Sequence, residues 1–497
     1  MKFRRLWLIL LAGCMLLHAS AWAEEVLRIG SKRFTESYIL GEILRESAAP
    51  HARVEHRQGL GNTAIVFEAL KSGSIDVYPE YLGTIDLEIL KNPAPTDLAA
   101  INRALAPMGL GAAVPLGFSN GYALAMRESD ARRLAVKSIS DLARQNEQRY
   151  GLSHEFIGRA DGWPGLSQRY GIRTPPIGIE HALAYDALAQ KQIDVIDIYS
   201  TDAKIRQYGL QVLADDAGYF PRYDAVLLYR LDAPGRFPQA WRALQALEGR
   251  ISESGMIAMN AAAELEGRTF AEVARGFLSR DGGNVKPRAG LWDKLFDENM
   301  ARLTRQHVTL VLLAVALATL VGLPLGILAA LVRPLRQAVM ALVGVLQTVP
   351  SLALLAMLIP LLGSIGTAPA LVALFLYALL PIVRNTSVGL EGVPSGLRMA
   401  ALALGLTRRQ ALTHVELPLA LPTILAGVKT AAVVSVGTAT IAAFIGAGGY
   451  GERIAIGLAL NDHQMLLAGA IPAALLALAT QLLFEIIEWL LARRRAV

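Results

Sequence analysis

Few residues in this sequence combine the types and the spacing that catalysis requires. The sequence contains no G-x-x-x-x-G-K-[ST] segment, so the chain has no P-loop to cradle nucleotide phosphates. His414 and His463 have no nucleophile or metal-ligand partner at a recognisable spacing. The spacing of Asp194, Asp197 and Asp202 indicates solvated loop charges, not a metal site. We therefore expect no catalytic residue, no metal and no cofactor, and a chain that is not an enzyme.

The composition indicates two physical regimes within one chain. Of its 497 residues, 53% are hydrophobic and 18% are charged, and the mean hydropathy is +0.39. Such a chain is too apolar for a water-soluble protein and too charged to lie wholly within a membrane. Charges are dense before about Arg305 and sparse after it. The net charge of +6 does not indicate nucleic acid, because the basic residues cluster beside apolar runs, where they set membrane topology.

The amino terminus has the features of a secretory signal. A basic start precedes the apolar run Leu6–Leu17, and Ala21-Trp22-Ala23 has the small-x-small pattern of a cleavage site. We expect a signal peptide at 1–23 and export of the segment that follows. Leu11–Cys14 also resembles a lipobox, and an uncleaved anchor is a third alternative. Cys14 is the only cysteine, so the sequence excludes an intrachain disulfide.

Apolar runs after Arg305 predict an all-α polytopic membrane domain over 305–497. The runs are 307–332, 337–383, about 419–447 and 465–491, and a Gly-Ser-Ile-Gly break at 363–366 divides the second into two passes. Five passes that begin outside place Arg333, Arg408 and Arg493 in the cytoplasm, as the positive-inside rule requires. Thr348-Val349-Pro350 can instead split the second pass into a kinked or re-entrant pair, so five and six spans both stay open.

Two further features concern the fourth pass. Lys429 lies near its cytoplasmic end, where we expect the side chain to reach the lipid headgroups. Small residues recur along and just after this pass, which suits close helix packing: Gly427, Ser435, Gly437, Ala439 and Gly446.

The segment between the leader and the membrane domain has an α/β pattern. Val26–Gly30 and Ile75–Tyr78 predict strands, and Glu36–Ser47 and Thr63–Lys71 predict helices. A second alternating stretch at 176–199 favours a two-lobed binding protein with a cleft. We place this domain at 24–288, followed by a linker at 289–304. The stretch from about 279 to 293 includes Gly282, Gly283, Pro287 and Gly290, which suit mobility.

Four segments of this domain resemble the binding proteins of glycine betaine, choline and carnitine importers. They read IGSKRFTESYILGEIL, DVYPEYLGT, FIGRADGWPGL and IDVIDIYSTDAKI. QTVPSLALLA and IAAFIGAGGYG resemble the permeases of the same systems. The resemblance implies a natural fusion of a periplasmic-binding-protein fold of the type II kind with an ABC importer transmembrane domain.

The resemblance also implies a ligand site. A trimethylammonium group carries charge but no N–H, so aromatic faces hold it by cation–π contacts. Tyr81, Tyr122, Tyr199 and Tyr223 match the cage positions of the family. The residues that match the carboxylate end of a betaine are Lys32, Arg159 and the hydroxyl donor Thr84. Asn120 stands where some relatives have an acidic residue.

A polar, doubly basic patch between two apolar runs, 399–418, predicts a cytoplasmic docking loop. It resembles the EAA loop of ABC importer permeases, although Met399 replaces the leading Glu. The matching positions are Ala400, Ala401, Gly405, Val415, Leu417 and Pro418. The resemblance implies two copies of a separate ABC ATPase and a permease homodimer in the bacterial inner membrane, with the binding domain on the periplasmic or extracellular side.

We therefore expect an importer subunit for a quaternary-ammonium osmoprotectant of the glycine betaine, choline or carnitine class. Import of another amino acid or amine is an alternative, and so is a membrane receptor that senses a ligand without transporting it. The latter predicts no ATPase contact at Gly405 and a signalling domain after the last span.

Overall fold

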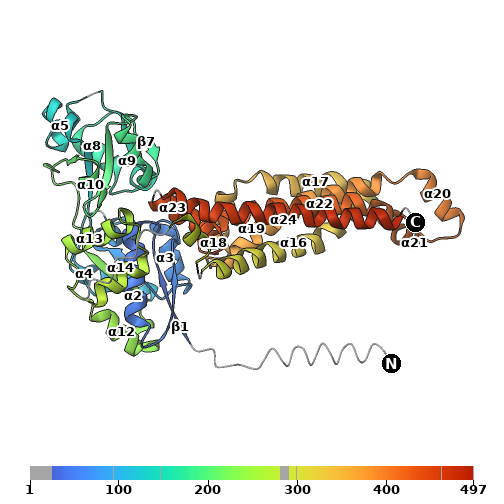
Figure 1. Cartoon of the computed structure of the whole chain (residues 1–497), viewed down its shortest axis with the longest axis horizontal. Helices are drawn as coiled ribbons and strands as arrows, with labels where there is room; N and C mark the ends of the chain where they lie inside the picture. Colours follow the sequence, from blue (N-terminus) through green and yellow to red (C-terminus); the bar gives the residue numbers. More distant parts are fainter. Residues whose placement is uncertain are drawn as a thin grey trace.

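The computed structural model describes residues 25–92, 94–145, 147–279, 290–297, 299–460 and 462–495. The described chain has a two-lobed α/β part, 25–279, and a helical part, 290–495, that projects from it as one long bundle (Figure 1). The expected leader at 1–23 and the glycine-rich stretch 280–289 lie outside the described residues.

Lobe 1 is built on a five-stranded sheet with the order β2-β1-β3-β10-β4. β1 is parallel to β2 and β3, whereas β10 is antiparallel to β3 and β4. The strands are β1 Val26–Gly30, β2 Arg53–Arg57, β3 Val77–Tyr81, β4 Leu110–Ala113 and β10 Ala225–Arg230.

Lobe 2 repeats this arrangement with the order β7-β6-β8-β5-β9. β6 is parallel to β7 and β8, and β5 is antiparallel to β8 and β9. The strands are β5 Tyr122–Arg127, β6 Tyr150–Ser153, β7 Ile177–Ile179, β8 Val195–Tyr199 and β9 Leu210–Val212. The chain crosses between the lobes twice, at 114–121 and at 213–224. The predicted two-lobed α/β fold is confirmed.

Helices cover both sheets. Those of lobe 1 are α2 Thr35–Ala48, α3 Thr63–Lys71, α4 Leu98–Leu105, α11 Ala233–Arg236, α12 Pro238–Gln245, α13 Glu253–Glu264 and α14 Phe270–Ser279. Those of lobe 2 are α5 Glu128–Leu134, α6 Ile139–Ala143, α7 His154–Gly158, α8 Trp163–Tyr170, α9 His181–Ala189 and α10 Lys204–Gln207. The most buried is α2, which packs against α12, α13 and α14 and whose Tyr38, Ile39 and Leu40 are at most 1% exposed. The helix predicted at Glu36–Ser47 is confirmed as α2, which is one residue longer at each end.

The helical part begins inside the range expected to be a linker. α15 covers Leu291–Leu295 and α16 starts at Met300, so this range contains ordered helix. The remaining helices are α17 Arg333–Thr348, α18 Ser351–Leu362, α19 Thr367–Glu391, α20 Ser395–Ala403, α21 Arg408–Ala411, α22 Leu417–Ala439, α23 Gly451–Leu460 and α24 His463–Arg495.

Four helical segments in the described chain are long and apolar enough to cross a membrane. They are Met300–Leu331, Thr367–Glu391, Arg408–Ala439 and His463–Leu491. α17 and α18 pass the same test together but are bent by 98° at Val349–Pro350, and they make a fifth span if the pair is one. The break foreseen at Pro350 is present, and so is the break at 363–366, because α18 ends at Leu362 and α19 starts at Thr367.

Lys429 has a protein partner within the bundle. Its Nζ lies 3.0 Å from the Glu488 carboxylate of α24. The ion pair replaces the headgroup contact expected from the sequence. Tertiary packing decides this, because Glu488 is 59 positions away along the chain.

Gly427 of α22 lies at a close approach of α19 and α22. A Cβ on Gly427 would lie 2.8 Å from the Pro381 carbonyl oxygen and 2.7 Å from the Asn385 Cβ, whereas a Cβ on Gly437 would meet nothing within 4 Å. Of these two glycines expected to aid packing, the contacts in the described chain require only Gly427.

We expect Gly427→Ala to destabilise the bundle by about 1–3 kcal/mol, because overpacking forces the two backbones apart. Gly437→Ala is the matched control in the same helix, and it should be neutral or stabilising by up to about 1 kcal/mol, since alanine favours helix. Thermal unfolding of the full-length variants in one detergent measures both effects. Equal midpoints for the two variants would contradict this account of the packing.

Candidate functional site

All eight side chains expected to bind ligand line one cavity between the lobes. Its volume is about 20 Å³. The lining consists of Lys32, Phe34, Tyr81, Thr84, Asn120, Tyr122, Glu155, Arg159, Tyr199 and Tyr223. These residues come from the loop after β1, from the end of β3 and the helical turn that follows it, from the start of β5, from α7 and the residue after it, from the end of β8, and from both crossover segments. The fold thus gathers residues that are scattered along the sequence.

Aromatic rings form most of the apolar wall of this cavity. The ring centroid of Tyr122 lies 5.1 Å from that of Tyr199 and 5.8 Å from that of Tyr223. Phe34 stacks on Tyr199 at 5.5 Å and tilts toward Tyr81 at 6.5 Å. Phe34 was missed by the sequence reasoning, although it lies two residues from Lys32 in a segment that carried the family resemblance.

Both cations of the cavity are already paired with carboxylates. Lys32 Nζ donates to Glu80 Oε1 at 2.6 Å. Arg159 Nη2 donates to Asp161 Oδ2 at 2.6 Å and to Thr84 Oγ1 at 3.2 Å. Neither Lys32 nor Arg159 is therefore an unpaired charge that faces the cavity.

The same two cations also lie on the aromatic faces. Lys32 Nζ is 5.1 Å from the centroid of the Tyr81 ring and 5.6 Å from that of Phe34. The Arg159 guanidinium is 5.2 Å from the centroid of Tyr122. These distances are within the range of cation–π attraction. Lys32 and Arg159 thus lie over aromatic faces of the kind that attract cationic ligands.

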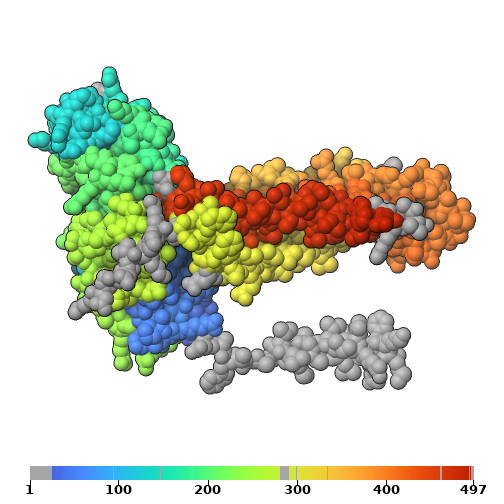
Figure 2. Space-filling view, in the orientation of Figure 1, coloured from blue at the N-terminus to red at the C-terminus, as the bar shows by residue number. Residues whose placement is uncertain are grey.

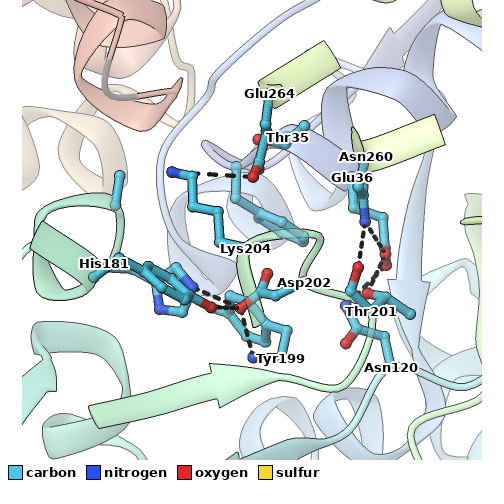
Figure 3. A pocket seen from close by; sticks show the side chains of 13 residues that line it. Thr35, Glu36, Asn120, His181, Tyr199, Thr201, Asp202, Lys204, Asn260 and Glu264 are labelled. Carbon is cyan, nitrogen blue, oxygen red and sulfur yellow. Dashed lines mark hydrogen bonds and ion pairs between the residues drawn. The ribbon is translucent and has the colours of Figure 1, made fainter. Parts of the chain in front are cut away.

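A buried carboxylate, Glu36, joins the cavity to both lobes. Its Oε1 accepts from the Tyr81 hydroxyl and from Asn120 Nδ2, the latter at 2.9 Å. Its Oε2 accepts from Thr201 Oγ1 at 2.5 Å and from Asn260 Nδ2 at 3.2 Å (Figure 3). Burial raises the pKa of Glu36, and the four donors oppose that shift. No local sequence pattern indicates this role of Glu36, because its four partners are 45 to 224 positions away along the chain.

A second cavity of about 30 Å³ lies behind Tyr199 and shares Phe34, Asn120 and Tyr199 with the first. The His181 ring packs tilted against Tyr199 with 4.6 Å between ring centroids, and its Nε2 lies 3.1 Å from Asp202 Oδ2 (Figure 3). The other titratable side chains on this cavity are Glu36, Tyr185, Lys204 and Glu264.

The expectation that Asp197 and Asp202 are solvated loop charges is wrong. Asp197 is 0% exposed and accepts from the amide and the hydroxyl of Ser153, both at 2.6 Å. Asp202 accepts from the Tyr185 hydroxyl and from the Tyr199 amide. Asp194 is paired with two arginines of lobe 2. Among the described residues, no group of three or more His, Cys, Asp or Glu is placed to hold a metal ion.

The two lobes are closed on each other. Thr63 of lobe 1 donates to Glu155 of lobe 2 at 3.1 Å, and Thr201 bonds to Glu36 across the same cleft. A cavity of about 20 Å³ admits roughly one water molecule. A larger ligand therefore requires the lobes to separate, and their closure then brings the rings onto it.

The segment expected to dock an ATPase is exposed at the far end of the bundle (Figure 1). Gly405 joins α20 to α21 with φ +85°, and Thr407 caps α21. Ala400 and Pro418 are exposed, Leu417 is half-buried and Ala401 is 4% exposed. Met399 and Leu404 present apolar side chains that are 64% and 84% exposed.

The pKa of His181 sets a pH range for the stability of lobe 2. Burial by itself lowers this pKa, but Asp202 and Asp197 outweigh burial and raise the pKa to about 10. Since the folded-state pKa lies above the ordinary value of about 6.5, the interaction stabilises the fold fully below pH 6.5 and is lost as the pH rises toward 10.

We expect His181→Asn to lower the free energy of unfolding by about 2 kcal/mol at pH 6 and by little at pH 10. Thermal scans of the full-length protein between these pH values measure the difference. His414→Asn, in the exposed segment, should show no such trend. A gap between wild type and His181→Asn that stays constant with pH would exclude the ion pair as its cause.

Two family models match the chain. The model described as the substrate binding domain of ABC-type glycine betaine transport system matches residues 25–280. The model described as the binding-protein-dependent transport system inner membrane component matches residues 322–497. The first match ends with the two-lobed part, and the second begins within α16 of the bundle.

Individual proteins resemble one part or both. The osmoprotectant import permease protein OsmW of Salmonella typhimurium is 45% identical over 202 residues, 40% of this chain and 91% of that protein. The ergothioneine transport permease/ergothioneine binding protein EgtU of Helicobacter pylori is 32% identical over 289 residues, 56% of this chain and 51% of that protein. A crystal structure of a glycine betaine/carnitine/choline ABC transporter is 28% identical with a TM-score of 0.44, and the match covers 51% of this chain and 98% of that one.

The two matches account for both parts of the structure and confirm the expected fusion of a receptor with a permease. The chain therefore belongs to the family of substrate-binding domains of ABC-type glycine betaine transport systems, joined on one polypeptide to an inner membrane component of binding-protein-dependent transport.

Proposed function

We propose that this chain captures a trimethylammonium osmoprotectant of the glycine betaine, choline or carnitine class and passes it through its own permease domain. The observation that carries the proposal is the convergence of Tyr81, Tyr122, Tyr199 and Tyr223, with Phe34, on one cavity between the lobes. Aromatic faces suit a cation that has no N–H to donate. OsmW, whose name describes osmoprotectant import, supports the same class.

The internal cations suit a zwitterionic ligand. A quaternary ammonium that enters between the rings displaces Lys32 and Arg159 from the ring faces that they contact. Both cations keep their carboxylate partners, and Arg159 keeps its contact with Thr84. Lys32, Arg159 and Thr84 then face the carboxylate end of the ligand, and Asn120 holds the wall between the two cavities.

Transport requires a separate motor. We assign ATP hydrolysis to two copies of an ABC ATPase that dock on Ala400, Ala401, Gly405, Leu417 and Pro418, and the translocation path to a homodimer of permease domains. The chain lies in the bacterial inner membrane with its two lobes on the periplasmic or extracellular side. Fusion keeps each receptor near its permease at roughly millimolar effective concentration.

Binding and uptake together test this function. Purified full-length protein is titrated by calorimetry with glycine betaine, choline, carnitine, ergothioneine and proline, and uptake is followed in proteoliposomes that contain the ATPase and ATP. We expect binding and ATP-dependent uptake of at least one trimethylammonium compound and no binding of proline. Binding without uptake would favour a sensing receptor, and preference for proline would favour an importer of another amino acid.

The cage predicts a difference between removing a ring and removing a hydroxyl. Tyr199→Ala and Tyr81→Ala should each weaken trimethylammonium binding about tenfold or more, since each loses roughly 1–2 kcal/mol of cation–π energy. Tyr199→Phe keeps the ring and should stay within about threefold of wild type. Calorimetric titration measures the affinities, with Tyr208→Ala, outside both cavities, as the control. Equal binding of a betaine analogue in which an uncharged tert-butyl group replaces the trimethylammonium group would exclude a cation–π cage.

A change in the docking segment should impair ATPase association without affecting ligand binding. Leu404 is 84% exposed, so Leu404→Glu should leave ligand affinity and thermal stability unchanged. Burial of this leucine against a partner contributes about 1.5–3 kcal/mol, so the variant should lose roughly tenfold or more in ATPase association. Co-purification of the ATPase and ATP-driven uptake measure this loss. Leu231→Glu, at an exposed leucine of lobe 1, is the control, and retention of the ATPase by Leu404→Glu would contradict the docking assignment.

A further inference from the structure

The loop between β1 and α2 faces two sites at once. Lys32 and Phe34 of this loop line the cavity between the lobes. Arg33, between them, contacts the permease domain, where its guanidinium lies 4.6 Å from the centroid of the Phe444 ring. Consecutive residues of one short loop therefore reach the ligand cavity and the permease.

A second loop of lobe 1 fixes this loop against the permease. Leu60 donates its amide to the Ser31 carbonyl at 3.0 Å, and the Arg33 amide donates to the Gly61 carbonyl at 3.1 Å. The Leu60 side chain is 0% exposed and fits against Gly446, where a Cβ would lie 2.4 Å from Leu60 Cδ2. Gly446 also has φ +77°, so both the backbone angle and the contact favour glycine there.

The permease segment that receives these loops is the end of α22. Phe444 lies in the 3₁₀ turn Ile441–Ile445, directly after α22. The start of α16 supports the following segment, because the Gly449 amide donates to Gln306 Oε1 at 3.2 Å. Lobe 2 contacts the same end of the bundle through α9 and α23, and the space-filling view shows the bundle end against the two-lobed part (Figure 2).

α22 therefore connects the two ends of the permease domain. It begins at Leu417, in the segment proposed to dock the ATPase, and it ends at Ala439, next to the turn that holds Phe444. A helix of 23 residues is about 35 Å long at 1.5 Å per residue. A continuous helix of this length can transmit displacement from one end to the other.

We propose that Arg33 couples the permease to the ligand cavity: through Phe444 it ties the loop 31–34 to α22, so that movement of α22 withdraws Lys32 and Phe34 from the cavity and releases the ligand to the permease. This role rests on the proposed function. Arg33 is a positioning residue, because it acts through its two neighbours and does not line the cavity.

The test separates binding from transport in the full-length chain with its ATPase in proteoliposomes. Radiolabelled glycine betaine serves as the probe for equilibrium binding and for ATP-driven uptake. Arg33→Ala and Phe444→Leu should each bind within about twofold of wild type, yet lose about tenfold or more in uptake rate. The double variant should be no slower than either single variant, since both remove one contact.

Two controls belong to this experiment. Phe444→Trp keeps an aromatic face and should restore most of the uptake. Arg132→Ala removes an arginine whose side chain is 77% exposed on lobe 2, and its uptake should equal that of wild type. Wild-type uptake by Arg33→Ala or by Phe444→Leu would overturn the proposal, and so would a loss of binding that parallels the loss of uptake.

A second measurement includes a readout that requires no ligand. In a Cys14→Ser background, a short bis-maleimide joins cysteines introduced by Arg33→Cys and Phe444→Cys. Because the proposed contact persists while α22 moves, ATP hydrolysis by the assembled complex should continue after cross-linking, and the cross-link should restore the uptake that the unlinked double-cysteine protein lacks. Arrest of hydrolysis by the cross-link, or no gain of uptake, would overturn the coupling. A wild-type chain that neither binds nor transports a trimethylammonium compound, while hydrolysis continues after cross-linking, would instead refute the proposed function alone.

Discussion

The closed form of the two lobes depends on the buried carboxylate of Glu36. Oε1 holds Tyr81 and Asn120, which line the ligand cavity, and Oε2 holds Thr201 of lobe 2 and Asn260 of lobe 1. A buried charge is costly unless donors surround it, so the arrangement is stable only when both lobes supply them. Separation of the lobes removes Thr201 from this set. The hydrogen bonds of this one carboxylate therefore depend both on the cavity wall and on the position of the opposite lobe.

The aromatic faces of the cavity are already in contact with cations of the protein itself. Lys32 and Arg159 occupy ring faces in the closed form, and each also has a carboxylate partner. A site of this kind can close without exposing bare rings or unpaired charges. Under the proposed function, a ligand cation replaces these contacts with better ones, which favours a cation that fits between several rings over a small amine that fits only one.

The two-lobed binding domain is held against the permease domain by more than the covalent connection. The described part of the expected linker contains α15 and the start of α16, and not an extended tether. Arg33 and Leu60 of lobe 1 and α9 of lobe 2 all contact the same end of the bundle. The receptor is therefore positioned by packing as well as by covalent connection, and its ligand loop forms part of the contact.

Local sequence patterns determined much of this protein. Apolar periodicity placed β1 and α3 at their observed bounds. Charge-free runs located the spans, because a membrane imposes a length and a polarity on each one. Proline and glycine marked the breaks at Pro350 and at 363–366, since both residues interrupt a helix. Segments that resemble the betaine-importer family identified all eight residues that now line one cavity. They succeeded because each lies at the end of a strand or in a loop whose sequence is itself distinctive.

Only the tertiary structure decided which charges are partners. The sequence suggested solvated loop charges for Asp197 and Asp202 and a headgroup contact for Lys429, whereas the fold buries or pairs every one of them. The fold also pairs Lys32 with Glu80 and Arg159 with Asp161. It also placed Phe34, Glu36 and Arg33, whose partners lie far along the chain. Residue pattern and spacing predict local helices and strands. The free energy of a buried charge instead depends on hydrogen-bond donors and ion-pair partners that only folding brings close to it.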